Sequence, residues 1–325
     1  MKKKTRFLLG FLSVLVVLLV AMYLFIPTKN STSVSSFILQ RRLLKLLVIF
    51  IVSSAIPIST ISFQTVVQNR FLTPGVLGIE ALFVFIQSGL YYFESLLGLN
   101  VEQSIYIYLV TIGVQIGLLL LLMNVSRGMM LSNFKVLLLL TMAFSMLLKN
   151  ASTFLQVLMD PNEFDKLQSS LYPSFQKMNA QPVMIGVAAV LLGILLILFI
   201  KMRHQLDALH LGMDGAKMLG INTKRLSKIV VVIVIIMTSL STILVGPLQF
   251  LGFMIANLTY QLTKEYKHGV LWLFSAVLGL VIVLAAQLIV ERLFLLTIPI
   301  SVFIEGIGGV LYLILLVKGE KHNAA

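Results

Sequence analysis

Ionisable residues that could do chemistry are scarce in this sequence, because long apolar stretches make up most of it. Of its 325 residues, 59% are hydrophobic and 11% are charged, and none is a cysteine. Without cysteine the chain has no thiolate nucleophile and no thiolate metal site. The four histidines all fall in polar connections between the apolar stretches: His204, His210, His268 and His322. The sequence therefore predicts neither a zinc site nor a histidine proton relay inside a membrane.

Three ionisable residues do fall in or near apolar stretches, namely Glu80, Lys149 and Glu305. An ionised carboxylate at the centre of a membrane helix costs on the order of 2.5–3.5 kcal/mol by insertion scales, so such groups face protein or water. For Glu80 and Glu305 two readings stay open, the wall of a passage and a paired or solvated position near a helix end. For Lys149, an interhelical polar contact is favoured over substrate binding. The chain also has no G-x-x-x-x-G-K-[ST] phosphate loop, so ATP would have to bind on another subunit.

The apolar stretches predict one all-α domain that spans a membrane repeatedly. A chain with so few charges cannot cover a water-facing surface, which argues against a soluble enzyme, a disordered regulator and a nucleic-acid-binding protein. A helix needs about 20 apolar residues to cross a bilayer. About ten stretches are of this kind: residues 7–26, 46–66, 78–97, 105–124, 135–158, 183–201, 227–245, 247–262, 269–290 and 299–317. We interpret the first as a true span, because it is longer than the core of a signal peptide.

Lysine and arginine lie mostly in the connections on the side of the N-terminus, which explains much of the net charge of +13 as topology. This bias predicts that both termini are cytoplasmic. The longest connection on that side, approximately residues 202–226, is amphipathic and contains three glycines that interrupt its helices. From composition alone it can be a packed connector or a docking surface, and the connector is favoured.

Four short motifs occur in order along the chain. They are Gln64 to Ile79 with Asn69, Pro74, Gly75 and Gly78; Leu211 to Ile221; Gly246-Pro247 with Phe250 and Gly252; and Ile298-Pro299-Ile300 with Gly308. Together with about ten spans, they resemble the permease family of bacterial iron-siderophore and vitamin B12 ABC importers, over nearly the whole chain. The resemblance implies the type II ABC importer permease architecture.

The resemblance also implies a function and a set of partners. The permease is expected to take up a ferric siderophore, delivered by an extracytoplasmic binding protein, by alternating access in the bacterial cytoplasmic (inner) membrane. Two copies of an ATPase subunit would bind ATP and Mg²⁺, so this chain is expected to bind no cofactor and to catalyse no reaction. Carriers of another chelate such as haem or cobalamin, or of free metal ions, are alternatives, and an intramembrane enzyme is a remote one.

Site residues follow from the matched motifs. The residues expected to contact the ATPase are Leu211, Gly212, Asp214, Gly215, Ala216, Lys217, Leu219 and Gly220. Arg42-Leu-Leu-Lys45 resembles a basic pair that meets acidic groups of the binding protein, so Arg42, Lys45, Arg41 and Arg292 are expected to dock it, with lipid anchoring as the alternative. The translocation pathway or its helix break is assigned to Gln64, Asn69, Pro74, Gly78, Glu80, Pro247, Gly252 and Glu305.

Some departures from the family pattern concern the oligomer. The chain has Ala256-Asn257-Leu258-Thr259-Tyr260-Gln261 where many members have P-H-x-x-R, and Asn69-Arg70 where Asn-Pro is usual. These variants resemble the divergent second permease of Gram-positive catecholate-type siderophore importers. We therefore expect a heterodimer with a different permease, with a homodimer as the alternative.

Overall fold

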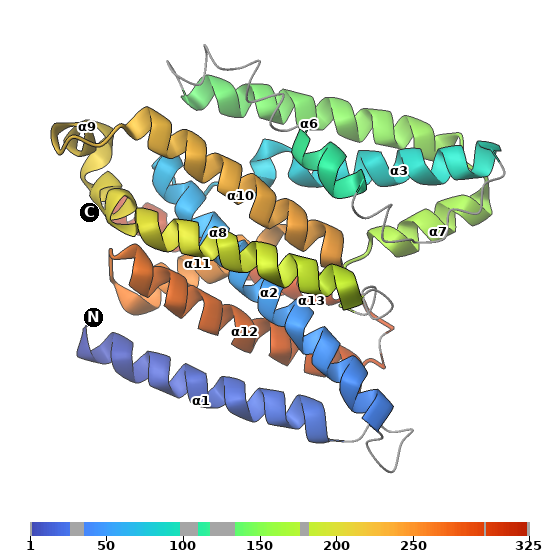
Figure 1. Ribbon diagram of the computed structural model, residues 1–325, viewed down its shortest axis with the longest axis horizontal. Helices are drawn as coiled ribbons and strands as arrows, with labels where there is room; N and C mark the ends of the chain where they lie inside the picture. The colour runs from blue at the N-terminus through green and yellow to red at the C-terminus, as the bar shows by residue number, and fades with distance from the viewer. Residues whose placement is uncertain are drawn as a thin grey trace.

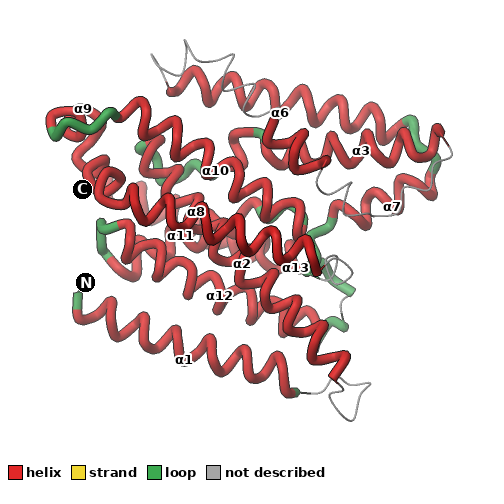
Figure 2. Tube along the Cα trace, in the orientation of Figure 1, coloured by secondary structure: helices red, strands yellow, loops and turns green. Residues whose placement is uncertain are grey.

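The computed structural model describes residues 2–26, 36–97, 110–117, 134–175, 182–295 and 297–323, and every regular element bounded within them is a helix (Figures 1 and 2). In chain order the bounded helices are α1 (Lys3–Phe25), α2 (Ser36–Val67), η1 (Pro74–Leu77), α3 (Ile79–Leu97), α6 (Phe134–Val157), α7 (Pro161–Leu171), α8 (Pro182–Ala208), η3 (Leu209–Leu211), α9 (Gly212–Met218), α10 (Thr223–Val245), α11 (Gln249–Thr263), α12 (His268–Arg292) and α13 (Ile300–Asn323). Most of the expected span 105–124 lies outside the described residues.

Five of the helical stretches in the described part of the chain are long and apolar enough to cross a membrane. They are α1, α2, α8 continued through α9, α10 and α12. Helices α3, α6, α11 and α13 lie where further spans are expected, and their crossing of the bilayer stays a prediction.

Helix α2 passes through the middle of the bundle and packs against α8, α10, α11 and α12 (Figure 1). Almost every side chain between Val48 and Val66 is buried, although several of them are serine or threonine. Their hydroxyls donate to carbonyls of the preceding turn, as Ser53 does to Ile49 at 2.6 Å. This local bonding satisfies polar atoms that have no water to bond in a membrane.

Two glycines let neighbouring helices approach α2 closely. A Cβ built at Gly279 of α12 would lie 2.5 Å from the carbonyl oxygen of Ser53, and one built at Gly252 of α11 would overlap the Thr60 hydroxyl. Small residues at such contacts are usual in membrane bundles, where close backbone packing replaces the hydrophobic effect as the main attraction between helices.

Different helix ends and connections lie at the two ends of the bundle (Figure 1). At the end that we call the N-terminal end, α1 and α12 begin, α2 finishes, and α9 protrudes. The backbone N–H of Lys2 donates to Glu265 at 2.6 Å there, and the Thr5 hydroxyl donates to the Thr263 carbonyl at 3.3 Å. At the opposite end α1 and α12 finish and α2 begins. The helices thus run between two surfaces that carry the candidate site residues.

Candidate functional site

Residues 209–220, which we call the α9 segment, form a compact protrusion at the N-terminal end (Figure 1). Gly212 and Gly220 have φ values of 85° and 79°, a conformation that glycine adopts at little cost, and they turn the chain before and after α9. Leu209 and Ala216 are buried against the bundle. Leu211, Met218 and Leu219 instead are 69%, 90% and 62% exposed, so the segment presents an apolar tip.

The charged residues of the α9 segment form a local pair. The Lys217 ammonium donates to Asp214 at 2.7 Å, three residues away, and both side chains are more than half exposed. A surface pair of this kind contributes little to stability. Gly215 is close to the tip, because a Cβ there would lie 3.0 Å from Cβ of Leu211. The segment therefore offers apolar side chains for contact, with one ion pair beside them.

Polar contacts join the ends of three long helices at the root of the α9 segment. The amide of Gln68, just after α2, donates to the Leu209 carbonyl at 3.0 Å. Asp207, in the last turn of α8, accepts from both the backbone N–H and Nδ1 of His268 at 2.7 Å each. Nε2 of His268 lies 2.9 Å from the Thr65 hydroxyl of α2. Sequence reasoning missed His268 and Asp207, because residues far apart in polar connections give no signal that they meet and become buried.

Thr65, His268 and Asp207 lie in the order hydroxyl, imidazole, carboxylate, which is the order of a nucleophilic triad. Their burial argues against that chemistry. His268 is fully buried and Thr65 is 6% exposed, so a substrate carbonyl has no approach to the hydroxyl. No group of three or more histidine, aspartate or glutamate side chains in the described ranges could hold a metal ion. The cluster is therefore a buried connection between helices.

The break after α2 and the start of α11 meet around a small cavity inside the bundle. Its volume is about 30 Å³, enough for about one or two water molecules. Four of the predicted pathway residues are near it: Pro74, Glu80 and Gly252 line it, and Gly78 follows η1 beside them. Thr60, Thr238 and Thr242 add hydroxyl groups to the wall.

The other predicted pathway residues lie away from this cavity. Gln64 is buried and donates to the Arg70 carbonyl at 2.7 Å, while Asn69 accepts from the backbone N–H of Phe71 at 2.9 Å. Both therefore shape the turn after α2. Pro247 is half-buried in the connection from α10 to α11.

Two charged residues expected in spans lie on exposed helix surfaces. Glu305 lies on the exposed surface of α13 with Gly306 and Ile307 beside it. Lys149 is exposed on α6. The interhelical contact expected for Lys149 is not seen among the described residues.

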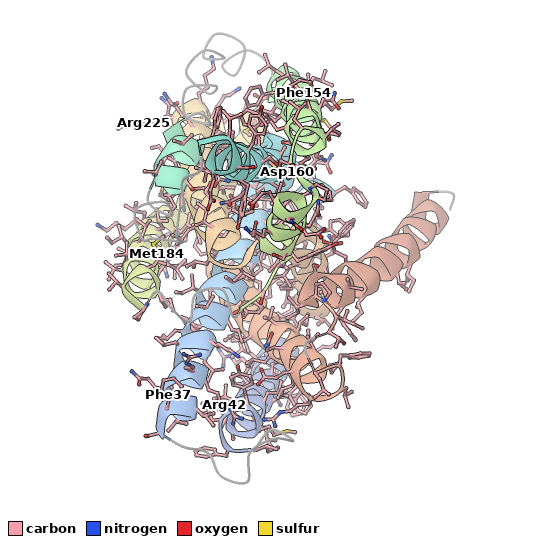
Figure 3. The ribbon with its side chains drawn as sticks, turned by 90° about the vertical axis from the view of Figure 1, so that its right-hand side faces the viewer. Phe37, Arg42, Phe154, Asp160, Met184 and Arg225 are labelled. Atoms are coloured by element: carbon pink, nitrogen blue, oxygen red, sulfur yellow. The ribbon has the colours of Figure 1, made fainter. Side chains whose placement is uncertain are left out.

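The predicted role of Arg42 in docking needs correction. Helix α2 begins at Ser36 rather than near residue 46, which places Arg42 beside the last turn of α1. Arg42 is 4% exposed and donates to the carbonyls of Leu24 and Ile26 at 2.6 and 3.1 Å (Figure 3). A cation at the last carbonyls of a helix satisfies unpaired acceptors and the negative end of the helix dipole. Arg42 is therefore not available to a partner as the structure stands.

The neighbouring basic residues either bond to the end of α1 or are partly or fully exposed. Arg292 at the end of α12 also donates to the Ile26 carbonyl. Lys45 is half-buried, and Arg41 is exposed with its guanidinium 4.6 Å from the centre of the Phe37 ring. Arg41 is thus the most accessible of the three basic residues in α2.

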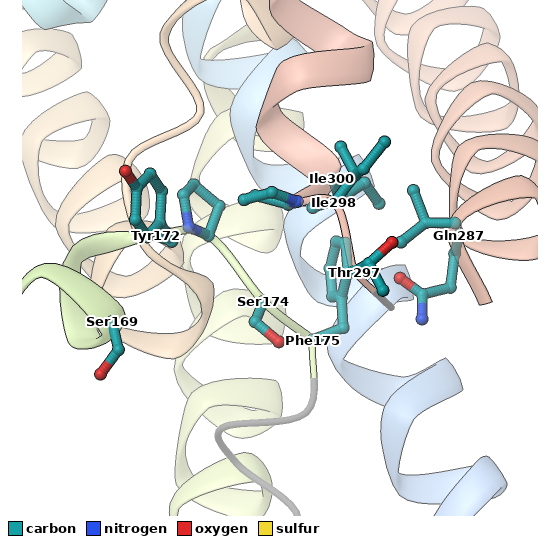
Figure 4. Close-up of a pocket in the computed structure, with 11 residues that line it drawn as sticks. Ser169, Tyr172, Ser174, Phe175, Gln287, Thr297, Ile298 and Ile300 are labelled. Atoms are coloured by element: carbon teal, nitrogen blue, oxygen red, sulfur yellow. The ribbon is translucent and has the colours of Figure 1, made fainter. Parts of the chain in front are cut away.

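A larger pocket opens at the opposite end of the bundle, between the end of α7, the segment after it, α12 and the start of α13 (Figure 4). Its volume is about 200 Å³. The lining is a mixture of hydroxyl, amide and apolar groups: Ser169, Tyr172, Pro173, Ser174, Phe175, Gln287, Val290, Thr297, Ile298, Pro299 and Ile300. Of these, the fourth motif contains Ile298, Pro299 and Ile300, while the sequence did not single out the others.

Comparison with known proteins adds to this geometry. The model of the FecCD transport family matches residues 7–318. The petrobactin import system permease protein YclO of Bacillus subtilis (strain 168) is 32% identical over 286 residues, covering 88% of this chain and 90% of YclO. The corresponding protein FatC of Bacillus anthracis is 28% identical over 281 residues, covering 86% and 79%. A solved structure described as an inward-facing metal-chelate type ABC transporter superimposes with a TM-score of 0.83 at 22% identity, over 97% of this chain and 99% of that one.

Proposed function

The chain belongs to the FecCD transport family, and we propose that it is the membrane-spanning permease subunit of an ABC importer for a ferric siderophore. The observation that carries the proposal is the family match over residues 7–318, together with relatives that are named as petrobactin import permeases. The fold agrees with a chain whose function is passage and not bond chemistry, since its triad-like cluster is buried.

We infer that the N-terminal end of the bundle faces the cytoplasm, where the α9 segment contacts an ATPase subunit. Its exposed Leu211, Met218 and Leu219 suit insertion into an apolar cleft of that partner. Two ATPase copies would bind ATP and Mg²⁺ and supply the free energy for the cycle. The segment is bonded to Gln68 after α2 and follows directly on α8, whose Asp207 is bonded to His268 of α12, so a displacement of its tip has a direct route to helices of the core.

At the opposite end, we propose that Arg41 and Lys45, two of the four residues that the sequence assigned to docking, contact the binding protein. Arg41 is exposed and Lys45 is half-buried, and both lie on α2 near its beginning. Acidic groups of an extracytoplasmic siderophore-binding protein would steer toward them. Arg42 and Arg292 keep a structural role at the end of α1.

The passage for the chelate is proposed to lie along the surface of α13 that carries Glu305, between this chain and a second permease. A carboxylate on an exposed membrane-helix surface is costly in lipid and is tolerated beside water or another subunit. Figure 3 shows that α13 leans away from the rest of the bundle, which leaves that surface open. The cavity at Pro74, Glu80 and Gly252 would be part of the wall that changes shape. The second permease is expected to be a different chain, giving a heterodimer.

The test is reconstitution of the complete importer in proteoliposomes. The permease pair, the ATPase and the binding protein are supplied together, and uptake of ⁵⁵Fe-loaded petrobactin is measured with and without ATP. ATP-dependent uptake of this chelate, with none of cobalamin, haem or free Mn²⁺, supports the proposal. Equal uptake of cobalamin would refute the substrate class, and flux through the permease alone would refute the subunit role.

A further inference from the structure

His268 connects two separate helices to the root of the α9 segment. Its ring is fully buried at the first residue of α12. Nδ1 and the backbone N–H both reach Asp207 Oδ1 at 2.7 Å, so a carboxylate from α8 caps the beginning of α12. Nε2 lies 2.9 Å from the hydroxyl of Thr65, which is in the last turn of α2. One ring therefore bridges α8 and α2 while it belongs to α12.

The number of hydrogen bonds in this bridge depends on the charge of the ring. An ionised Asp207 only accepts, so Nδ1 must donate to it. In the neutral ring Nε2 has no proton, and the Thr65 hydroxyl must donate to it, which removes the bond to the Ile61 carbonyl 3.0 Å away. In the cationic ring Nε2–H donates to Thr65, and Thr65 donates to Ile61. Only the cationic form therefore makes every contact a hydrogen bond.

The bridge lies directly against the α9 segment. His210 of η3 stacks on the His268 ring, with the ring centroids 5.1 Å apart. Gln68 has a φ of 56° and donates to the Leu209 carbonyl, which makes a second tie from α2 to the segment. Such a left-handed backbone is uncommon outside glycine and asparagine and needs local contacts to hold it. The segment is therefore held by the stacking of His210 on a buried ring and by a strained, bonded turn.

We propose that Thr65, His268 and Asp207 form a hydrogen-bonded joint, in which His268 is the positioning residue that makes α2 and α12 follow displacements of the α9 segment. The inference rests on the proposed function, because it assigns to the joint the transmission of ATPase movement to the core. Hydrogen bonds with charged partners in a buried site resist rupture more than neutral ones. Thus the joint moves as a unit while the exposed tip of the segment follows the partner.

The two halves of the joint can be cut separately in the reconstituted importer. His268→Asn places an amide near Nδ1 and keeps the Asp207 contact alone, whereas His268→Gln reaches the position of Nε2 and keeps the Thr65 contact alone. Thr65→Val removes the hydroxyl, and Thr65→Ser restores it. Each cut is expected to lower siderophore transported per ATP hydrolysed by about tenfold, the equivalent of one buried charged hydrogen bond. Thr65→Ser is expected to recover most of that loss.

Matched controls exist on exposed surfaces. His204→Asn changes an exposed histidine of α8, and Thr153→Val removes a hydroxyl that bonds the Lys149 carbonyl on α6. Both are expected to transport as the wild type does. The double variant of Thr65→Val and His268→Asn is expected to be no worse than either alone, because both remove the same contact.

A second measurement does not depend on transport. The native chain has no cysteine, so Met218→Cys and Asn69→Cys can carry spin labels alone. Their distance distribution is expected to be narrow in the complex and broad after Thr65→Val or His268→Asn. Unchanged transport per ATP in both cut variants, or an unchanged distribution, would overturn the joint. Absence of siderophore uptake by the wild type would instead refute the proposed function, and the distance measurement would still decide about the joint.

Discussion

Gly279→Ala tests whether Gly279 is what allows α12 to approach α2 closely. The new Cβ would lie 2.5 Å from the carbonyl oxygen of Ser53 and 3.2 Å from Cδ1 of Ile255. Carbon to oxygen contacts are normally no shorter than about 3.3 Å, so the helices must separate by about 0.8 Å at this point. The obstacle at Ser53 is a backbone carbonyl in the middle of a buried helix, and it cannot rotate away as a side chain can.

The size of the effect is best expressed as the difference in the free energy of unfolding between two glycine-to-alanine variants. Gly193 lies in the middle of α8 and has nothing within 4 Å of a built Cβ, so Gly193→Ala should stabilise its helix by about 0.5–1 kcal/mol. Gly279→Ala receives the same helical benefit but overfills the contact, which costs about 1–3 kcal/mol. The two variants should therefore differ by about 1–3 kcal/mol in the free energy of unfolding.

Equilibrium unfolding in mixed SDS and detergent micelles measures this difference, followed by the fluorescence of Trp272. Adding Ile255→Ala should recover little of the loss, since the Ser53 carbonyl is the main obstacle. If Gly279→Ala unfolds at the same SDS fraction as Gly193→Ala, α2 and α12 do not approach as closely as the structure has them. Full recovery by Ile255→Ala would place the obstacle on the side chain instead.

Three further outcomes are expected. Arg42→Ala should lower the free energy of unfolding of the permease by about 2–4 kcal/mol, because it leaves carbonyls of α1 unpaired in a buried site. Arg41→Ala should leave stability unchanged and slow binding-protein association, measured by surface plasmon resonance at low and high salt. Gly215→Val should push Leu211 aside and leave ATP hydrolysis running without uptake, so an importer with full uptake would contradict the role of the tip. The bond from the Lys2 N–H lowers the pKa of Glu265, so the tie between α1 and the connection before α12 is present above the usual glutamate range and is lost as the pH falls through the lowered value. Amide exchange of the first turn of α1 should therefore rise on acidification, and Glu265→Gln should abolish that response.

Much of the architecture could be predicted from the sequence because it depends on composition. A chain with 59% hydrophobic and 11% charged residues can be stable only with its helices in lipid, and the predicted all-α membrane permease is confirmed by the helical structure of the described residues and by the family match. The family itself was predicted from four motifs and is likewise confirmed. Glycines at the ends of α9 were a local signal, since chain turns need their conformations.

Side-chain environment could not be predicted in the same way. Arg42 looked like a docking cation because a basic residue near a span end usually reaches water. Its burial depends on where α1 finishes relative to α2, and that contact joins residues eighteen and sixteen positions apart in the chain. The structure therefore buries Arg42, whereas Arg41 beside it is exposed, and docking at this end stays a prediction.

Composition and motif spacing by themselves determined the class of protein, its helices and its family, because hydrophobicity and local turn preferences act along the chain. Only the tertiary structure decided which polar residues are buried and with whom, as for His268 with Asp207 and Thr65. The physical reason is that a hydrogen bond between distant residues depends on three-dimensional helix packing, and neither periodicity nor charge counting contains that information.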